Sequence, residues 1–234
     1  MKKKEISKII VSKNGPYLIS GKLPLDKQIV VEDKDNYPTR WKQGEKFPLQ
    51  EKYALCRCGN SKHKPFCDGT HMKVKFPGTE VASNKPYIKQ SSKTIGPDIY
   101  LTDAELFCSN AGFCHKAGGT WTLTQSDNSK ARATAVQQAC NCPSGRLTMW
   151  NKKTKKPIEP KFKQSISIIE EPTNNISGPI WVKGNIPIES EEKGTKYEIR
   201  NRVTLCRCGK SGNKPFCDGT HVEINFNDGD KDLQ

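Results

Sequence analysis

The sequence is poor in hydrophobic residues and has no long apolar run. Only 33% of its 234 residues are hydrophobic, and the mean hydropathy is −0.75. A membrane-spanning helix needs about 20 consecutive apolar residues, so we expect no association with a membrane. An apolar signal region is also missing after the opening Met1–Lys4. We therefore expect a cytoplasmic protein whose ten cysteines bind metal or stay reduced and do not form disulfides.

The common signatures of catalysis are also missing. The sequence contains no phosphate-binding glycine loop, no dinucleotide fingerprint and no convincing Ser/His/Asp set, and it has only four histidines. We predict that the protein is not an enzyme. The formal charge is +14, but the lysines are scattered and form no recognised nucleic-acid-binding motif. This charge is better suited to attracting an acidic protein partner than to binding nucleic acid.

Cysteine is plentiful, and six of the ten cysteines belong to a repeated stretch. Residues 56–71 recur at 206–221, and the two copies differ at only three of sixteen positions. Three cysteines and a terminal histidine recur in register, so each copy offers three thiolates and one imidazole, which are typical metal ligands. The three differences are Asn60 to Lys210, Lys62 to Gly212 and His63 to Asn213, so we expect no shared ligand role for His63.

The ligand spacing favours a two-iron cluster over zinc. Zinc sites usually use a Cys-x-x-Cys knuckle, whereas here the order is Cys-x-Cys, eight residues, Cys, three residues and His. Cys56 and Cys58 form one close pair, and Cys67 forms a second pair with His71, one helical turn further on. Two pairs supply two ligands for each of two irons. Zinc remains the alternative.

The repeated stretch resembles the CDGSH iron–sulfur motif of the mitoNEET family. Cys67-Asp68-Gly69-Thr70-His71 stands where that name is spelled, with threonine in place of serine. The family binds a [2Fe–2S] cluster through three cysteines and one histidine, so the resemblance implies two such clusters here. The implied inner and outer ligand pairs are Cys56 with Cys58 and Cys67 with His71 in the first copy, and Cys206 with Cys208 and Cys217 with His221 in the second.

Four further residues of the two motifs have supporting roles in this interpretation. Asp68 and Asp218 can accept backbone N–H groups and fix the turn before Thr-His, and the alternative is an ordinary Asp-Gly turn. Ser61 and Ser211 can hydrogen-bond cluster sulfur or the loop backbone. The arginine between the paired cysteines of each copy either offsets cluster charge or is simply solvated.

The repeat extends beyond the ligands to a whole module. The phrase at 15–25 returns at 178–188, each time as a short strand between turns. We also predict an edge strand at 9–11 and a surface loop at 33–45. Because the resembled family packs two motifs as a two-fold pair, usually from two chains, we expect an internal pseudo-two-fold pair in one monomer. The strands predicted around the ligands are 53–56 and 203–206 before them, and 73–76 and 223–226 after the histidines.

The segment between the copies combines a helix with the remaining cysteines. Residues 129–138 are rich in alanine and follow Asp127 and Asn128, either of which can cap a helix. The predicted helix leads directly into the second of two cysteine pairs. These pairs are Cys108 with Cys114 and Cys140 with Cys142.

This middle segment resembles a single-cluster bacterial ferredoxin, and also the divergent single-cluster 4Fe–4S domain found beside CDGSH motifs. Cys108, Cys114 and Cys142 match three elements of the ferredoxin pattern. Ala111 stands at the remaining cysteine position, which favours a [3Fe–4S] cluster unless Cys140 supplies a fourth ligand to a [4Fe–4S] cluster. A zinc site or four buried, reduced cysteines are the alternatives.

The pattern as a whole predicts an α+β protein with CDGSH modules at 1–82 and 175–234 and a small ferredoxin-like domain at 83–174. Clusters with thiolate ligands move one electron at a time, so one-electron transfer to redox partner proteins is the first function that we expect. A neutral imidazole ligand should raise the potential and make the cluster labile at low pH. The alternative is therefore a cluster carrier or iron-homeostasis protein serving apo-protein acceptors, or a redox sensor.

Overall fold

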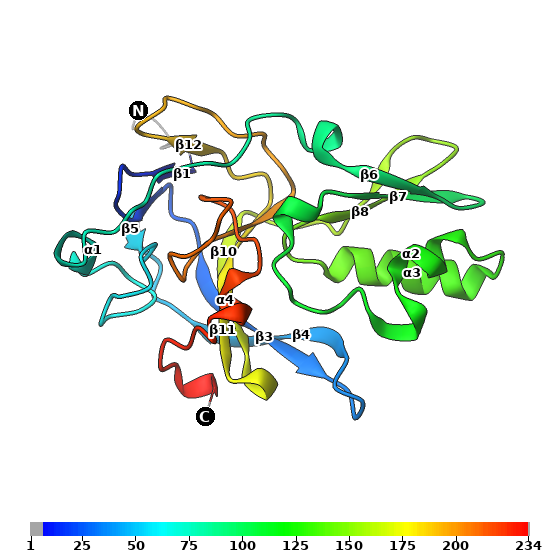
Figure 1. Ribbon diagram of the computed structural model, residues 1–234, viewed down its shortest axis with the longest axis horizontal. Helices are drawn as coiled ribbons and strands as arrows, with labels where there is room; N and C mark the ends of the chain where they lie inside the picture. Colours follow the sequence, from blue (N-terminus) through cyan, green and yellow to red (C-terminus); the bar gives the residue numbers. More distant parts are fainter. Residues whose placement is uncertain (1–6, 234) are drawn as a thin grey trace.

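The computed structural model describes residues 7–233, which form three small β-sheets and a few short helices (Figure 1). The strand orders are β12-β1-β2-β5, β13-β11-β10-β3-β4 and β6-β7-β8-β9. This architecture confirms the predicted α+β class. The strands are β1 Lys8–Val11, β2 Tyr17–Ser20, β3 Leu25–Glu32, β4 Pro38–Lys46, β5 Lys52–Leu55, β6 Ser92–Ile95, β7 Ile99–Asp103, β8 Leu147–Asn151, β9 Pro157–Ile158, β10 Ser165–Glu171, β11 Ile176–Lys183, β12 Ile188–Ser190 and β13 Arg202–Leu205; the α-helices are α1 Thr70–Lys73, α2 Thr120–Gln125, α3 Ser129–Asn141 and α4 Thr220–Glu223.

The first two sheets are built from equivalent strands of the two copies. In the first copy β1 runs antiparallel to β2, with Ile9 opposite Ile19. In the second copy β10 runs antiparallel to β11, with Ile166 opposite Val182. β2 then pairs with β5, and β11 pairs with β13, so that each sheet delivers a strand to the first cysteine of its motif.

Each copy also donates one strand to the other. β3 follows β2 in the chain but pairs in parallel with β10, with Leu25 opposite Ile166. β12 follows β11 but pairs in parallel with β1, with Ile188 opposite Ile9. All four side chains belong to one buried hydrophobic cluster that includes residues of both copies. The reciprocal exchange joins the two copies as the internal pseudo-two-fold pair that the repeat predicts.

The predicted strands after the two histidines are wrong. The short helices α1 and α4 end at residues 73 and 223, and each is followed by a turn and not by a strand. The amides of Phe76 and Phe226 donate back to the carbonyls of His71 and His221, at 2.9 and 2.8 Å, and close each helix. The alternating pattern was too short to distinguish a strand from one helical turn.

Two further predictions about the first copy are also wrong. The stretch at 33–45 is not a surface loop, because β4 pairs with β3 and places Trp41 opposite Val30. The strand at 9–11 is not at a sheet edge, because β1 lies between β12 and β2. The two errors have different causes. The partner that covers β1 is β12 of the other copy, far away in the sequence, whereas β4 pairs with the neighbouring β3 but is too polar and exposed to show a strand pattern.

The middle segment forms a separate sheet covered by α2 and α3. Leu101 and Met149 of this sheet pack on Ala135 and Ala139 of α3 in a second buried cluster. The predicted helix is confirmed, and the Asn128 side chain caps it by accepting the amides of the second and third helical residues. Strand β10, at the end of the segment 83–174, lies in the sheet of the paired copies. No helix among residues 7–233 is long and apolar enough to cross a membrane.

Candidate metal centres

The two repeated loops have the same backbone geometry, and each begins where a strand ends. Leu55 forms an isolated bridge with Phe66, and Leu205 forms the same bridge with Phe216. The amide of the next residue in each copy, Cys56 or Cys206, donates to a proline carbonyl at 2.8 or 2.9 Å. The loop thus folds back on its own strand, and this brings the later cysteine and the histidine close to the first cysteine pair.

The supporting aspartates accept backbone amides. Asp68 accepts the amides of Lys62 and Thr70 at 2.9 and 3.0 Å, and these bonds lower the pKa of its carboxyl well below the ordinary range. Asp218 accepts the amides at 212 and 220, at 2.7 and 3.1 Å. Burial opposes the shift there, but the Thr220 hydroxyl, which donates to Asp218 at 2.7 Å, and these amides outweigh it, so the pKa of Asp218 is lowered. Both carboxylates therefore stay ionised and fix the turn before Thr-His.

The supporting serines bond to the loop backbone. Ser61 Oγ donates to the Phe66 carbonyl at 2.7 Å and accepts the amide of residue 63. Ser211 Oγ makes the equivalent bonds to Phe216 and residue 213. Of the two roles considered for these serines, the structure therefore places them in the backbone role.

The sulfur and nitrogen positions in each loop suit two ligand pairs. The Sγ atoms of Cys56 and Cys58 are 3.8 Å apart, and Cys67 Sγ lies 3.4 Å from His71 Nδ1. The second copy repeats both distances, with 3.8 Å within its Cys-x-Cys pair and 3.4 Å between Cys217 and His221. Two ligands about 2.3 Å from one tetrahedral ion are separated by roughly 3.8 Å. The donor sets therefore fit an iron–sulfur group with two ligands on each iron.

The two loops contact each other across the pseudo-two-fold axis. A Cβ atom placed on Gly59 would lie 2.6 Å from the carbonyl oxygen of Cys208, and one on Gly209 would lie 2.6 Å from that of Cys58. Both glycines also have positive φ, 77° and 79°. Glycine is required here for its missing side chain and for its backbone conformation.

The ligand pairs differ in burial between the copies. His221 is only 2% exposed and Cys217 only 3%, whereas Cys67 and His71 are half-buried. Burial lowers the pKa of His221 to about 4, and the Arg207 charge adds to this. Its Nε2 has no hydrogen-bond partner in the described part of the chain. The second site is therefore an internal site.

The middle segment covers the second site. The carbonyl oxygen of Cys108 would lie 3.4 Å from a Cβ on Gly219, whereas a Cβ on the equivalent Gly69 would meet only a methionine methyl, at 3.6 Å. The Phe107 and Phe216 rings meet edge to face with centroids 5.1 Å apart. Asn213 Nδ2 donates to the Leu106 carbonyl at 2.7 Å. One of the three differences between the motifs thus contacts the middle segment.

Three of the four middle cysteines line one small cavity, namely Cys108, Cys114 and Cys142. Burial, together with the neighbouring Cys142 and Cys108, raises the pKa of the Cys114 thiol to about 12. Three thiols that line one pocket are well suited to a cationic metal group, which would compensate the charge of their thiolates. His115 also borders this cavity but is exposed.

The structure does not bring Cys140 to this cavity. Its Sγ lies 3.6 Å from the carbonyl oxygen of Ile158, at strand β9. The reason is the helix: α3 continues through Asn141, so that Cys140 and Cys142 do not project in the same direction. The fourth ligand that the sequence offered is therefore separated from the other three.

Sequence reasoning missed two charged side chains near the middle cysteines. Arg146 borders the cavity and forms two bonds to Asp103, at 2.6 and 3.0 Å. The buried Arg202 donates to the carbonyls of Ala139, Cys140 and Leu147 at 3.0 to 3.2 Å and joins the second copy to the middle segment. The sequence did offer a way to find Arg202, because the equivalent position of the first copy, Lys52, is also basic.

Comparison with known families agrees with this geometry. The family described as iron-binding zinc finger, CDGSH type, matches residues 14–72 and 177–222. The family described as divergent 4Fe-4S mono-cluster matches residues 94–152. Searches of curated proteins and of solved structures found no match. The chain is an iron–sulfur protein. Its two outer regions match the CDGSH family model, and they flank a region that matches the divergent 4Fe-4S mono-cluster model.

Proposed function

We propose that this protein is a one-electron carrier and not an enzyme. It would hold a [2Fe–2S] cluster in each CDGSH loop and a third cluster in the middle cavity. The clusters supply the redox chemistry when bound, and the chain positions and tunes them. The ligands would be Cys56, Cys58, Cys67 and His71; Cys206, Cys208, Cys217 and His221; and Cys108, Cys114 and Cys142.

The observation that carries this proposal is the direct contact between the three sites. The Cys108 backbone lies against Gly219 of the second loop. The second loop in turn lies against the first through Gly59 and Gly209. Electron transfer slows steeply with distance, so adjacent sites favour an electron carrier over a protein that stores separate clusters.

The third cluster would have three cysteine ligands. A [3Fe–4S] cluster needs no fourth cysteine, and a [4Fe–4S] cluster would need a ligand other than Cys140 on its remaining iron. Arg146, at the cavity wall, would offset part of the negative charge of either cluster.

The expected acidic partner would dock beside the first site. Three exposed or partly exposed lysines in and after the first motif are replaced by uncharged or acidic residues in the second, which leaves the rim of the first site more basic. A basic rim speeds encounter with an acidic protein. The three pairs are Lys62 and Gly212, Lys73 and Glu223, and Lys75 and Asn225.

Metal analysis tests the proposal most directly. Iron, acid-labile sulfide and EPR spectra would be measured on anaerobically purified wild type, Cys140→Ser and Cys142→Ser. We expect about seven or eight iron per chain in the wild type, no change in Cys140→Ser, and a loss of about three or four in Cys142→Ser. About four iron with only [2Fe–2S]-type signals would remove the third cluster, and the absence of reversible reduction would contradict electron transfer.

The partial exposure of the first site favours a second candidate, a carrier that hands its cluster to an apo-protein. Cys67 and His71 are half-buried, so an acceptor thiol can approach this cluster directly. Incubation with an apo-ferredoxin, followed by absorbance and iron analysis of both proteins, separates the two functions. Transfer of one [2Fe–2S] cluster within minutes would support the carrier, and retention of both would support the electron carrier.

A further inference from the structure

A buried arginine stands between the paired cysteines of each copy. Arg57 is 1% exposed and Arg207 is 2% exposed, so neither is solvated. Each donates to the carbonyl of a residue at the equivalent position: Arg57 Nη1 to Ser12 and Arg207 Nη2 to Ile169, both at 3.1 Å. The two guanidinium groups therefore occupy matching positions beside the two metal sites.

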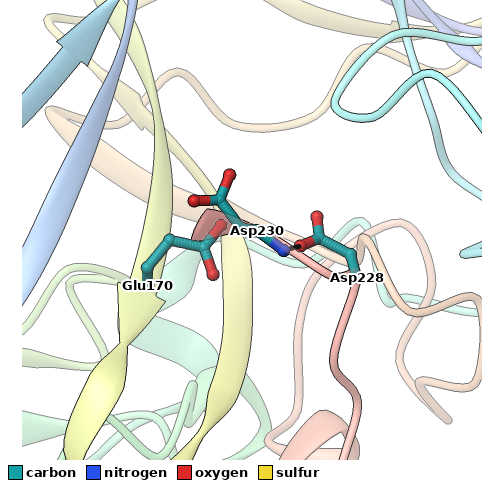
Figure 2. Close-up of side chains that lie close together, drawn as sticks. All are labelled: Glu170, Asp228 and Asp230. Carbon is teal, nitrogen blue, oxygen red and sulfur yellow. Dashed lines mark hydrogen bonds between the residues drawn. The ribbon is translucent and has the colours of Figure 1, made fainter. Parts of the chain in front are cut away.

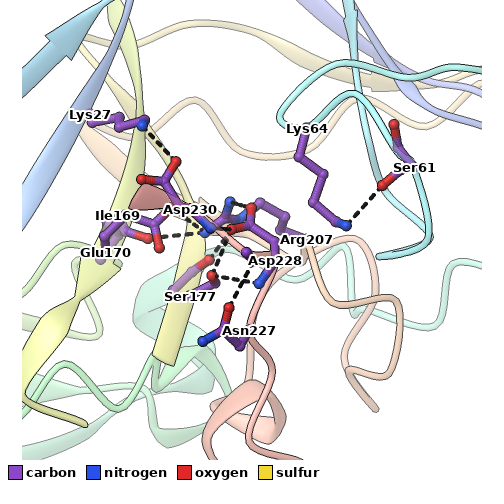
Figure 3. A network of polar contacts seen from close by, with 12 residues as sticks. Lys27, Ser61, Lys64, Ile169, Glu170, Ser177, Arg207, Asn227, Asp228 and Asp230 are labelled. Carbon is purple, nitrogen blue, oxygen red and sulfur yellow. Dashed lines mark hydrogen bonds and ion pairs between the residues drawn. The ribbon is translucent and has the colours of Figure 1, made fainter. Parts of the chain in front are cut away.

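The charge around the two arginines differs. Arg207 pairs with Glu170, with Nη2 2.9 Å from Oε1, and also with Asp228 (Figure 3). The other partners of Arg57 are the Gly78 carbonyl, at 2.5 Å, and two aromatic rings. No carboxylate pairs with Arg57 among residues 7–233. The positive charge is thus compensated at the second site and uncompensated at the first.

The difference in charge around the two arginines comes from residues at equivalent positions of the two copies. Ser12 is followed by Lys13, whereas Ile169 is followed by Glu170. The residue 150 positions after Gly78 is Asp228. At both places the second copy has a carboxylate where the first copy has none.

The carboxylates form an ion-pair network and not a cation site. Figure 2 shows Glu170, Asp228 and Asp230 together, with carboxylate oxygens within 4.8 Å of one another. Two cations already lie among them. Arg207 pairs with the first two, and Lys27 Nζ lies 2.5 Å from Asp230. A bound divalent ion would be repelled by both.

We propose that Glu170 and Asp228, acting through Arg207, give the second CDGSH site a lower reduction potential than the first. This inference rests on the proposed function, because it requires a [2Fe–2S] cluster at both sites. Reduction adds a negative charge, which an uncompensated guanidinium stabilises and a neutralised one does not. Burial of the second site acts in the same direction, since a buried site solvates added charge poorly. Electrons would therefore settle at the first site, which is the exposed one.

The test is a redox titration of the intact holoprotein followed by EPR at pH 8. Burial raises the pKa of Glu170 to about 7 despite the Arg207 charge, so this carboxylate is mostly ionised at pH 8. His71→Cys and His221→Cys assign the two midpoints, because an added thiolate lowers the potential of its own site. Glu170→Gln and Asp228→Asn keep the size of each side chain and remove its charge. Asp98→Asn, at an ion pair outside the network, is the matched control.

We expect two separate midpoints, with the second site lower. Glu170→Gln and Asp228→Asn should each move the lower midpoint upward and leave the higher one unchanged, and Asp98→Asn should move neither. If both clusters reduce reversibly at one potential, or if neither carboxylate variant shifts the second site, the inference is overturned while the proposed function stands. If no reversible [2Fe–2S] signal is found at all, the proposed function itself fails.

Discussion

The two CDGSH regions share nearly all of their motif but occupy different environments. Their ligand pairs have the same spacing, 3.8 and 3.4 Å in each copy. Yet the histidine at 221 is buried below the middle segment, and the one at 71 is half-buried near the outer edge of the molecule, where Figure 1 shows α1. Ligand geometry is therefore a local property of the loop, whereas exposure and charge depend on what packs against it.

The close contact between the two loops, which both copies make through a glycine, should be the most sensitive to substitution. Gly59→Ala would place a methyl group against the Cys208 carbonyl and force a positive φ on alanine, at a cost of about 4 kcal/mol in unfolding free energy. Gly69→Ala has the same φ problem but more room, so it should cost about 1–2 kcal/mol. Denaturant unfolding of the two variants provides the comparison, and equal losses would show that the loops do not need their close contact.

Weakening the contact between the middle segment and the second copy should make the two CDGSH sites lose iron to a chelator at similar rates. Arg202→Met leaves three carbonyls without their buried donor and should cost about 3 kcal/mol. It should also speed the removal of iron from the second site by a chelator toward the rate of the first, which is expected to be faster in the wild type. Lys52→Met, at the exposed equivalent position, is the control. Unchanged chelation of the second site in Arg202→Met would contradict its protection by the middle segment.

The second copy should also respond more strongly to pH. Burial, together with Glu32 and Glu170, raises the pKa of Glu171 to about 8, whereas the sequence of the first copy has Asn14 at the matching place. Because the folded-state pKa lies above the unfolded value, the native state binds the extra proton, and stability is lost as pH rises through 8. Because glutamine cannot ionise, the unfolding free energy of Glu171→Gln should rise by about 2 kcal/mol relative to the wild type between pH 6 and pH 9. If the unfolding free energies of Glu171→Gln and the wild type change in parallel between pH 6 and pH 9, Glu171 does not titrate with a raised pKa in the folded protein.

The smallest expected effect is at the rim of the first site. Lys73→Glu copies the second motif at an exposed position, so the unfolding free energy should change by less than about 0.5 kcal/mol. The rate of electron transfer to an acidic flavodoxin at low salt should nevertheless fall several-fold. Glu223→Lys on the second copy is the reciprocal control and should leave this rate nearly unchanged. If the electron-transfer rate is the same in Lys73→Glu as in the wild type, or changes equally in Glu223→Lys, the acidic partner does not dock beside the first site.

Much of this protein could be predicted from local sequence. The repeated ligands, the strands at 53–56 and 203–206, the capped helix after Asn128 and the paired copies all depend on short-range patterns or on the repeat itself. The helix ends and turns at 73–76 and 223–226 were mistaken for strands because four residues carry too little periodicity. β4 was mistaken for a loop because its residues are mostly polar and exposed or half-buried, although it pairs with the neighbouring β3.

The sequence by itself determined the two candidate donor sets, because three thiols and one imidazole recur at the same spacing within one short loop. Only the tertiary structure decided how the two sites differ in burial and charge, although their donor residues are the same. It placed Cys108 and Asn213 at the second site, turned Cys140 toward Ile158, and brought Glu170 and Asp228 to Arg207 from segments 37 and 21 residues away. These contacts join distant parts of the chain, and burial and charge follow from the packing that brings those parts together.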